Sequence, residues 1–172
     1  MGLLALLRRK PHERTGFELY GAAVAAARDP WFFGPLAVPD TLDGRFDVVG
    51  LQVALLIRRL RQDPDPRGPA IAQAVFDAMF ADMDINLREM GVSDLRVGKR
   101  MRQMWEAFHG RCLAYEAALD AGDDAALAAA RALAGHMAAA AAGLAGQPFA
   151  ALARGQVLFP ATPAAPEATD AA

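Results

Sequence analysis

Apolar side chains recur every three or four residues along most of this 172-residue chain, which is the spacing of one face of an α-helix. Five segments show this pattern, at residues 17–27, 46–60, 71–90 and 101–119 and in an alanine-rich stretch that begins at Asp123 or Asp124. No run alternates apolar and polar residues between turn residues, as a half-buried strand would. The pattern therefore predicts an all-α fold, a single helical-bundle-like domain of about five main helices.

Residue types that end or begin helices separate these segments. Pro30 stops the first one, and the proline-rich stretch 63–66 follows the second. Gly91 suits the C-cap of the third helix, and Ser93 or Asp94 suits the N-cap of the fourth. The short connections agree with a bundle in which consecutive helices pack together.

The two ends of the chain differ from this helical part. Residues 1–15 form an N-terminal extension whose leucine-rich start precedes three basic residues at 8–10, and we expect at most weak contact with a membrane. Residues 160–172 are rich in proline and alanine and cannot bury enough apolar surface to offset the entropy of ordering, so we expect a disordered tail. The helical domain is then expected at residues 16–159.

The composition excludes several classes of protein. With 54% apolar residues and a net charge of −2, the chain is neither disordered throughout nor a strongly basic nucleic-acid binder. The single cysteine, Cys112, cannot form an internal disulfide or a zinc site of several cysteines. The most apolar run, at 48–57, is too short to span a membrane, and Arg131 and His136 interrupt the alanine-rich stretch. We therefore expect a cytoplasmic protein, with at most peripheral contact at the inner face of the cytoplasmic membrane.

The loop from Trp31 to Phe46 is the least generic segment, because it combines aromatic residues with prolines and glycines and so predicts an ordered connection. Two interpretations stay open. In the first, Trp31 and Phe33 cover the core while Asp40 or Asp43 caps the next helix. In the second, these side chains bind a partner.

Charged residues on the third predicted helix indicate ion pairs on its surface and not a site for cation binding or acid–base catalysis. Asp84 and Arg88 are four residues apart and can pair across one turn. Asp77 shares the face of Asp84, but two carboxylates bind a cation only with burial and further ligands. We therefore predict a solvated or interhelical ion-pair face.

A metal site is the sharpest chemical alternative. Glu106 and His109 have the Glu-x-x-His spacing of di-iron helix bundles, which need two such motifs and further glutamates. Neither of the other histidines has a glutamate three residues before it. We therefore predict no metal and no cofactor, with His109 in the core or at an interface and Cys112 in core packing.

Two basic clusters lie at the ends of predicted helices. Residues 58–61 hold three arginines at a helix C-terminus, where the helix dipole favours cations. Lys99, Arg100 and Arg102 lie in the first turns of another helix, where the dipole opposes them. We therefore expect this second cluster to dock an acidic partner, phosphates or anionic lipid head groups.

Three strings of sequence carry a resemblance to a known family. They are VPDTLDGRFDVVGLQVALLIRRL at 38–60, FDAMFADMDINLREMGVSDLRVGKRM at 76–101 and EAFHGR at 106–111. They resemble the ubiquinol–cytochrome c chaperone domain, whose mitochondrial members are assembly factors for cytochrome b of the bc1 complex. The resemblance covers most of residues 17–119 and looks like a bacterial version of the domain.

The resemblance implies a non-enzymatic assembly chaperone that binds newly made cytochrome b and promotes assembly of the ubiquinol–cytochrome c reductase (bc1) complex of the respiratory chain. Its implied partners are cytochrome b or other bc1 subunits, with a small partner protein or the ribosome as further candidates. The candidate residues for binding a client or partner are Trp31, Phe33, Asp40, Asp43, Arg45, Asp84, Arg88, Glu89, Asp94, Lys99, Arg100, Arg102 and Arg111.

Two questions stay open at this point. Five methionines at helical spacing either offer an adaptable client surface or fill the core: Met79, Met83, Met90, Met101 and Met104. The alternative functions are a ribosome- or RNA-docking adaptor that uses the cluster at 99–102, and a metal-dependent oxidoreductase built on Glu106 and His109.

Overall fold

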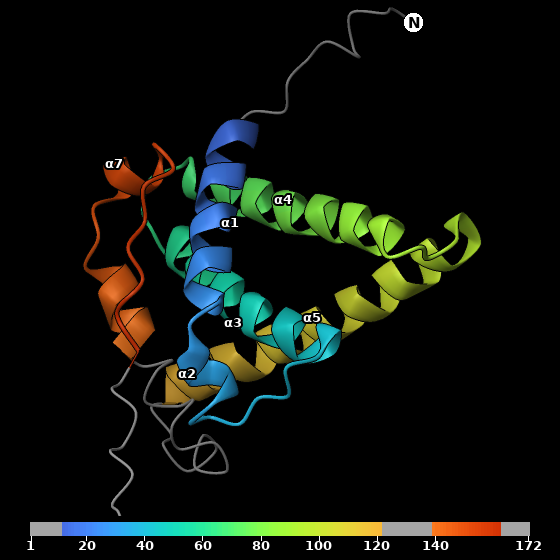
Figure 1. Ribbon diagram of the computed structural model, residues 1–172. Helices are drawn as coiled ribbons and strands as arrows, with labels where there is room; N and C mark the ends of the chain where they lie inside the picture. The colour runs from blue at the N-terminus through green and yellow to red at the C-terminus, as the bar shows by residue number, and fades with distance from the viewer. Residues whose placement is uncertain (1–11, 122–138, 163–172) are drawn as a thin grey trace, which may run out of the picture.

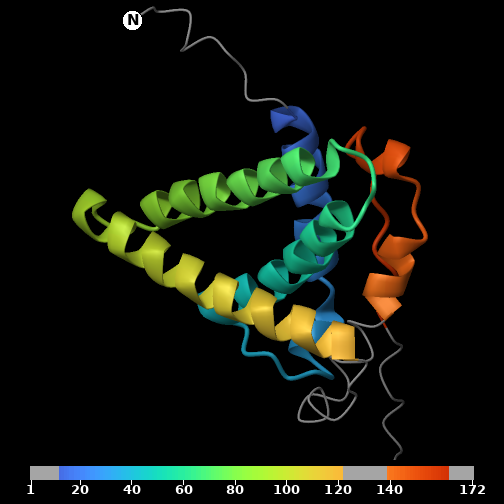
Figure 2. The same ribbon diagram turned by 180° about the vertical axis from the view of Figure 1, so that it is seen from behind.

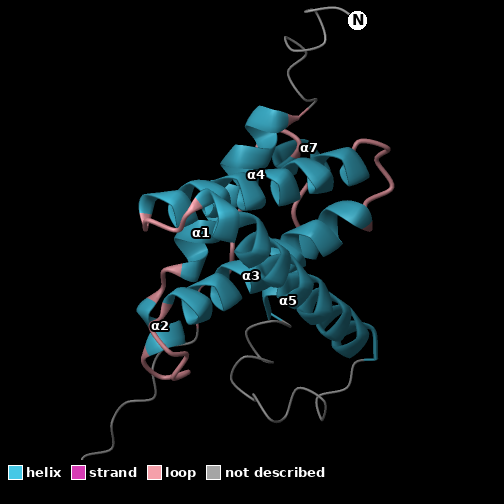
Figure 3. Ribbon diagram, turned by 90° about the vertical axis from the view of Figure 1, so that its right-hand side faces the viewer, coloured by secondary structure: helices cyan, strands magenta, loops and turns pink. Residues whose placement is uncertain are grey.

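The computed structural model describes residues 12–121 and 139–162 and shows only helices and loops within them (Figure 3). The helices are α1 (Glu13–Ala27), α2 (Pro30–Phe33), α3 (Leu42–Arg61), α4 (Gly68–Glu89), α5 (Asp94–Ala121) and α7 (Phe149–Leu152), and residues 139–145 are also helical. The predicted all-α fold is therefore confirmed. The predicted start of the alanine-rich helix at Asp123 or Asp124 lies outside the described residues.

Helices α4 and α5 diverge from the turn that joins them, like the two arms of a V (Figures 1 and 2). Helix α3 lies between the arms, and α1 packs across α4 and α3. The core fills the space around α3, where residues 51–56 are buried in an unbroken run. Helix α3 has so wide a buried surface because other helices and the C-terminal segment approach it from several sides.

The helix ends follow the sequence signals in most places. Asp29 caps α2 by accepting the N–H of Trp31 at 2.9 Å, and Gly91 takes a φ of 81° after α4. At α3 the prediction that Asp40 or Asp43 is the N-cap is wrong. Thr41 has the extended backbone of an N-cap, and its hydroxyl accepts the N–H of Gly44 at 3.2 Å. Both aspartates are thereby left to pair with arginines.

Helices α1 and α4 approach each other closely at Gly16. A Cβ atom at this position would lie 2.5 Å from the carbonyl oxygen of Ala74 and 2.9 Å from its Cβ. Only glycine fits here, because the neighbour is the backbone of another helix and cannot rotate away. Gly21, one and a half turns further along α1, would place a Cβ in open space.

We expect Gly16→Ala to destabilise the fold by about 2 kcal/mol, because the two helices must separate to admit the methyl group. Gly21→Ala in the same helix is the matched control and should stabilise by about 0.5–1 kcal/mol, since alanine has the better helix propensity. Urea unfolding of both variants measures the two free energies. Equal effects of the two substitutions would contradict the close packing.

The C-terminal residues 139–162 fold back along the side of the domain away from the α4–α5 turn (Figure 1). Leu144 and Leu152 are fully buried and join the core. Thr162 donates its hydroxyl hydrogen to Asp29 at 2.7 Å, so the first residues of the predicted tail at 160–172 lie against the domain. The rest of that tail, like residues 1–11, lies outside the described residues. Helix α1 begins three residues before the domain start predicted at residue 16.

Arg59 holds this C-terminal segment to α3. Its guanidinium donates from Nε to the carbonyl oxygen of Leu144 and from Nη2 to that of Gln147, each at 2.9 Å, and from Nη1 to Asp63 at 2.7 Å. Only 14% of the side chain is exposed, so these bonds are shielded from water. Arg59 therefore does more than offset the α3 dipole, because it binds one carbonyl group in the last turn of the helical residues 139–145 and one just after them.

We expect Arg59→Gln to lower the free energy of unfolding by roughly 2–4 kcal/mol, because it leaves Asp63 and two carbonyl groups without their charged donor. Hydrogen exchange at the amides of residues 144–158 should speed up more than exchange in α1 or α4. The matched control is Arg61→Gln at the same helix end, where no described residue forms an ion pair with the guanidinium. Unchanged exchange at 144–158 in Arg59→Gln would show that this contact does not hold the segment.

Candidate functional site

The aromatic loop after α1 builds a small core of its own. Trp31 is 7% exposed and Phe32 is fully buried, and both pack with Ala27 and Val48. Their rings meet edge to face with centroids 5.4 Å apart. Trp31 therefore anchors the loop on the domain, and Phe33 is left half-buried at the surface.

A groove of about 680 Å³ lies between this loop and the four helices α1 to α4. We call it the α1–α4 groove, and its apolar lining includes Val24, Phe33, Leu42, Val49, Met83 and Met90. Leu42 is 42% exposed and Met90 is 53% exposed, so this apolar surface is open to solvent. Such a concave apolar surface is typical of a binding site.

The two longest strings that carry the family resemblance meet in this groove. Leu42, Arg45 and Val49 come from the string at 38–60, and Met83 and Asn86 come from the string at 76–101. The strings are separate in sequence, and the packing of α4 beside α3 brings them together. Of the residues predicted to bind a client, Phe33, Asp40 and Arg45 line the same groove.

The methionines divide between the two roles considered from the sequence. Met79 is fully buried, Met104 is 5% exposed, and Met101 packs against the core. Met83 and Met90 line the groove. Part of the stripe therefore fills the core, and the part near the end of α4 forms adaptable surface.

A hydrogen bond between Tyr20 and Asp82 forms one wall of the groove. The phenol donates to Oδ2 of Asp82 at 2.7 Å, and the tyrosine is 5% exposed. Burial, followed by this hydrogen bond, raises the pKa of Tyr20 well above its ordinary value of 10. The phenol therefore stays neutral at physiological pH and serves to join α1 to α4. Neither residue was a predicted site residue, although Tyr20 belongs to the apolar stripe of the first helix.

Because folding raises the pKa of Tyr20, its contribution to stability is complete below about pH 10 and is lost as the pH rises further. In Tyr115→Phe, Tyr20 is the remaining tyrosine of the chain, and phenolate absorbance at alkaline pH should appear together with unfolding. Alkaline titration followed by absorbance and circular dichroism tests this. Reversible ionisation near pH 10 in the folded variant would contradict the buried hydrogen bond.

Most of the predicted charged site residues pair with one another. At the groove rim Arg45 contacts both carboxylate oxygens of Asp40, at 2.5 and 3.1 Å, and these bonds lower the pKa of Asp40. Arg100 on α5 pairs with Asp43 at the start of α3. These residues therefore hold an exposed rim and an interhelical contact in place.

Two further arginines connect helices. Arg111 on α5 pairs with Asp47 on α3 at 2.7 Å, where burial raises the pKa of Asp47 although Arg111 opposes this. Arg88 pairs with Asp84 at 2.7 Å and also with Asp94 at the start of α5, so it spans the α4–α5 turn. The ion-pair face predicted on the third helix is confirmed for Asp84 and Arg88, whereas the Arg111–Asp47 pair was not predicted.

The basic cluster at the start of α5 does not form a continuous set of unpaired cations. Arg100 pairs with Asp43, and Arg102 pairs with Glu106 at 2.9 Å. Lys99 and Glu89 are exposed and form no ion pair within the described part of the chain. Docking through this cluster would therefore compete with pairs already present.

The residues considered for metal chemistry are used in other ways. Glu106 pairs with Arg102, and His109 stacks on Trp105 with ring centroids 5.2 Å apart. Burial raises the pKa of Cys112 to about 11, so its thiol is protonated at neutral pH. In the ranges 12–121 and 139–162 no group of three or more His, Cys, Asp or Glu residues could hold a metal ion.

No helix in those ranges is long and apolar enough to cross a membrane.

Comparison with known proteins decides the family. The family model of the ubiquinol-cytochrome C chaperone matches residues 35–130, which is more than half of the chain. The chain belongs to this family. The matched region contains the α3 and α4 parts of the groove and all of α5, so the family match covers much of the site described above.

Two individual relatives agree with this membership. The crystal structure of the Cbp3 homolog from Brucella abortus superposes with a TM-score of 0.77 at 34% sequence identity, covering 94% of this chain and 98% of that one. Ubiquinol-cytochrome-c reductase complex assembly factor 1 from Xenopus laevis is 29% identical over 99 residues. That match covers 58% of this chain and 48% of the frog protein, so the chain spans about half the length of that relative.

Proposed function

We propose that this protein is a non-enzymatic chaperone for assembly of the ubiquinol–cytochrome c reductase (bc1) complex. We further propose that it binds newly made cytochrome b in the α1–α4 groove. The observation that carries the proposal is the meeting of the two family strings in one open apolar groove. Family membership and the name of the frog relative support the assembly role.

The chemistry of the groove suits an apolar client. A newly made client with exposed apolar segments needs cover for them before it is assembled. Phe33, Leu42, Met83 and Met90 offer apolar contact, and unbranched methionine side chains adapt to different client shapes. Arg28 and the Arg45–Asp40 pair supply the polar rim that surrounds the apolar centre of protein interfaces.

Binding explains the described residues better than catalysis does. The carboxylates around the groove pair with arginines or accept the Tyr20 hydroxyl, so they are occupied by structural contacts. The alternatives of ribosome or RNA docking and of metal-dependent oxidation gain no support from the contacts of Arg100, Arg102 and Glu106. We further propose that the protein works in the cytoplasm, with peripheral contact at the inner face of the cytoplasmic membrane.

Met83→Glu tests the groove, since a carboxylate facing an apolar client segment costs several kcal/mol when it is desolvated. We expect the amount of cytochrome b that copurifies with the chain to fall at least about tenfold, and assembled bc1 complex to fall with it in a deletion strain complemented by the variant. Leu158→Glu is the matched control, because Leu158 is 79% exposed and does not line the groove. Normal cytochrome b binding by folded Met83→Glu would overturn the assignment of the groove. Normal bc1 levels in the deletion strain would overturn the function.

A further inference from the structure

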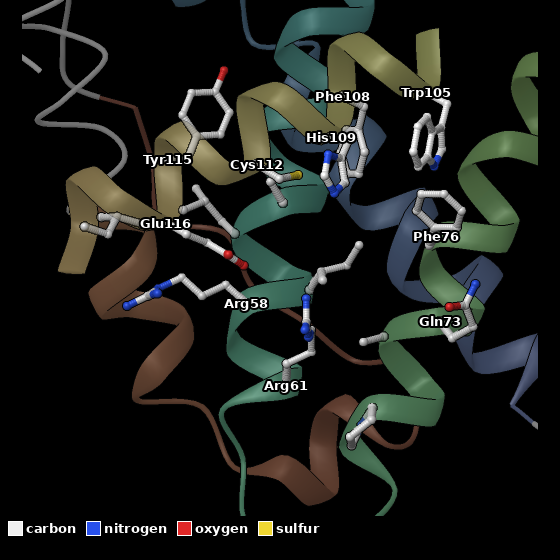
Figure 4. A pocket seen from close by; sticks show the side chains of 16 residues that line it. Arg58, Arg61, Gln73, Phe76, Trp105, Phe108, His109, Cys112, Tyr115 and Glu116 are labelled. Carbon is white, nitrogen blue, oxygen red and sulfur yellow. The ribbon is translucent and has the colours of Figure 1, made fainter. Parts of the chain in front are cut away.

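A second cavity, of about 430 Å³, lies between α3, α4 and α5 (Figure 4). We call it the α5 cavity. It involves the last part of α3 and the first part of α4, whereas the α1–α4 groove involves the first part of α3 and the last part of α4. The two cavities share no lining residue, so the α5 cavity needs an explanation of its own.

The inside of the α5 cavity is apolar and aromatic. Leu55, Ala72 and Phe108 are core residues that form part of its wall, and Phe76 lies with its ring centroid 6.0 Å from that of Phe108. Cys112 also lines the cavity, and its protonated thiol behaves as a small apolar group. These walls offer contact to an apolar body, and the polar groups of the lining come from other residues, among them Gln73 and Tyr115.

The mouth of the cavity carries an exposed aromatic pair. Trp105 is 44% exposed although it is a large apolar residue, and its ring stacks on that of His109 at an interplanar angle of 18°. Both side chains line the cavity from α5 (Figure 4). An exposed tryptophan beside an apolar cavity is the kind of residue that supplies much of the energy of binding.

Cations gather at one end of the same cavity. Arg61 directs its guanidinium toward the α5 residues His109 and Cys112 (Figure 4). Within the described residues no carboxylate pairs with it, whereas Arg58 beside it pairs with Asp120 at 2.6 Å. Glu116 is the one carboxylate among the lining residues, and Arg58 is already neutralised by Asp120, so Arg61 is the cation of the lining that has no ion-pair partner among the described residues.

We propose that the α5 cavity binds a single-chain amphiphile with an anionic head group, of which a fatty-acid carboxylate is the simplest case. The head group pairs with Arg61, and the chain lies against the Phe76 and Phe108 rings beside the Trp105–His109 pair. A small inorganic anion would leave the apolar walls in contact with water, and an uncharged lipid would gain nothing from the guanidinium of Arg61, which is exposed to solvent at the edge of the cavity. The combination of an apolar interior and a cation at one end therefore selects a molecule with both parts.

Calorimetric titration of the full chain with decanoate below its micelle concentration tests the proposal. We expect one saturable site, with binding at least about tenfold weaker in Arg61→Gln, because a charge-assisted hydrogen bond is lost. Decanol has the same chain without the charge, and it should bind more weakly than decanoate and bind both proteins alike. Acetate, which has the charge without the chain, should show no binding. Trp105→Ala should weaken decanoate and decanol together.

Arg154→Gln is the matched control, because Arg154 is exposed, contacts Gln156 and does not line the cavity. It should bind decanoate as the natural chain does, and circular dichroism should show every variant folded. Equal affinity of Arg61→Gln and the natural chain for decanoate, many weak sites, or no binding at all would each overturn the proposal. Met83→Glu should keep decanoate binding, so loss of the proposed client and loss of the amphiphile are separate results.

Discussion

The burial of α3 on almost every side is the constraint on which the rest of the structure depends. Residues 51–56 are buried without a break, so this helix cannot lie on the surface of a bundle as an amphipathic helix does. Helices α1, α4 and α5 and the C-terminal segment supply the cover. Gly16 allows α1 to pack closely against α4. The three hydrogen bonds of Arg59 hold the C-terminal segment against α3.

The central place of α3 also explains where the two cavities lie. Helices α4 and α5 diverge from their common turn, and α3 lies between them (Figure 2). The first part of α3 borders the α1–α4 groove, and its last part borders the α5 cavity. Interhelical pairs such as Arg100–Asp43 and Arg111–Asp47 lie along the α3–α5 contact. Exposed ion pairs add little to the free energy of unfolding. We therefore infer that these pairs act by fixing the position of α5 relative to α3.

The sequence predicted the positions of the helices and the contacts between residues close in sequence. It did not predict which side chains on different helices contact each other. Helical spacing, Pro30 and Gly91 located the helices and their ends, because these signals act within a few residues. The i,i+4 pair of Asp84 and Arg88 was predicted for the same reason. The N-cap of α3 was misassigned, because Thr41 lies next to two aspartates that can cap a helix equally well by composition.

What the sequence by itself determined is therefore the all-α class, the approximate extent of the helices and the resemblance of the strings at 38–60, 76–101 and 106–111. Only the tertiary structure decided that Asp43 meets Arg100, that Tyr20 donates to Asp82, and that Met83 lines a groove while Met79 lies in the core. The physical reason is that helix formation depends on neighbours three or four residues apart. These contacts join residues on different helices, or depend on which side of one helix is covered by another.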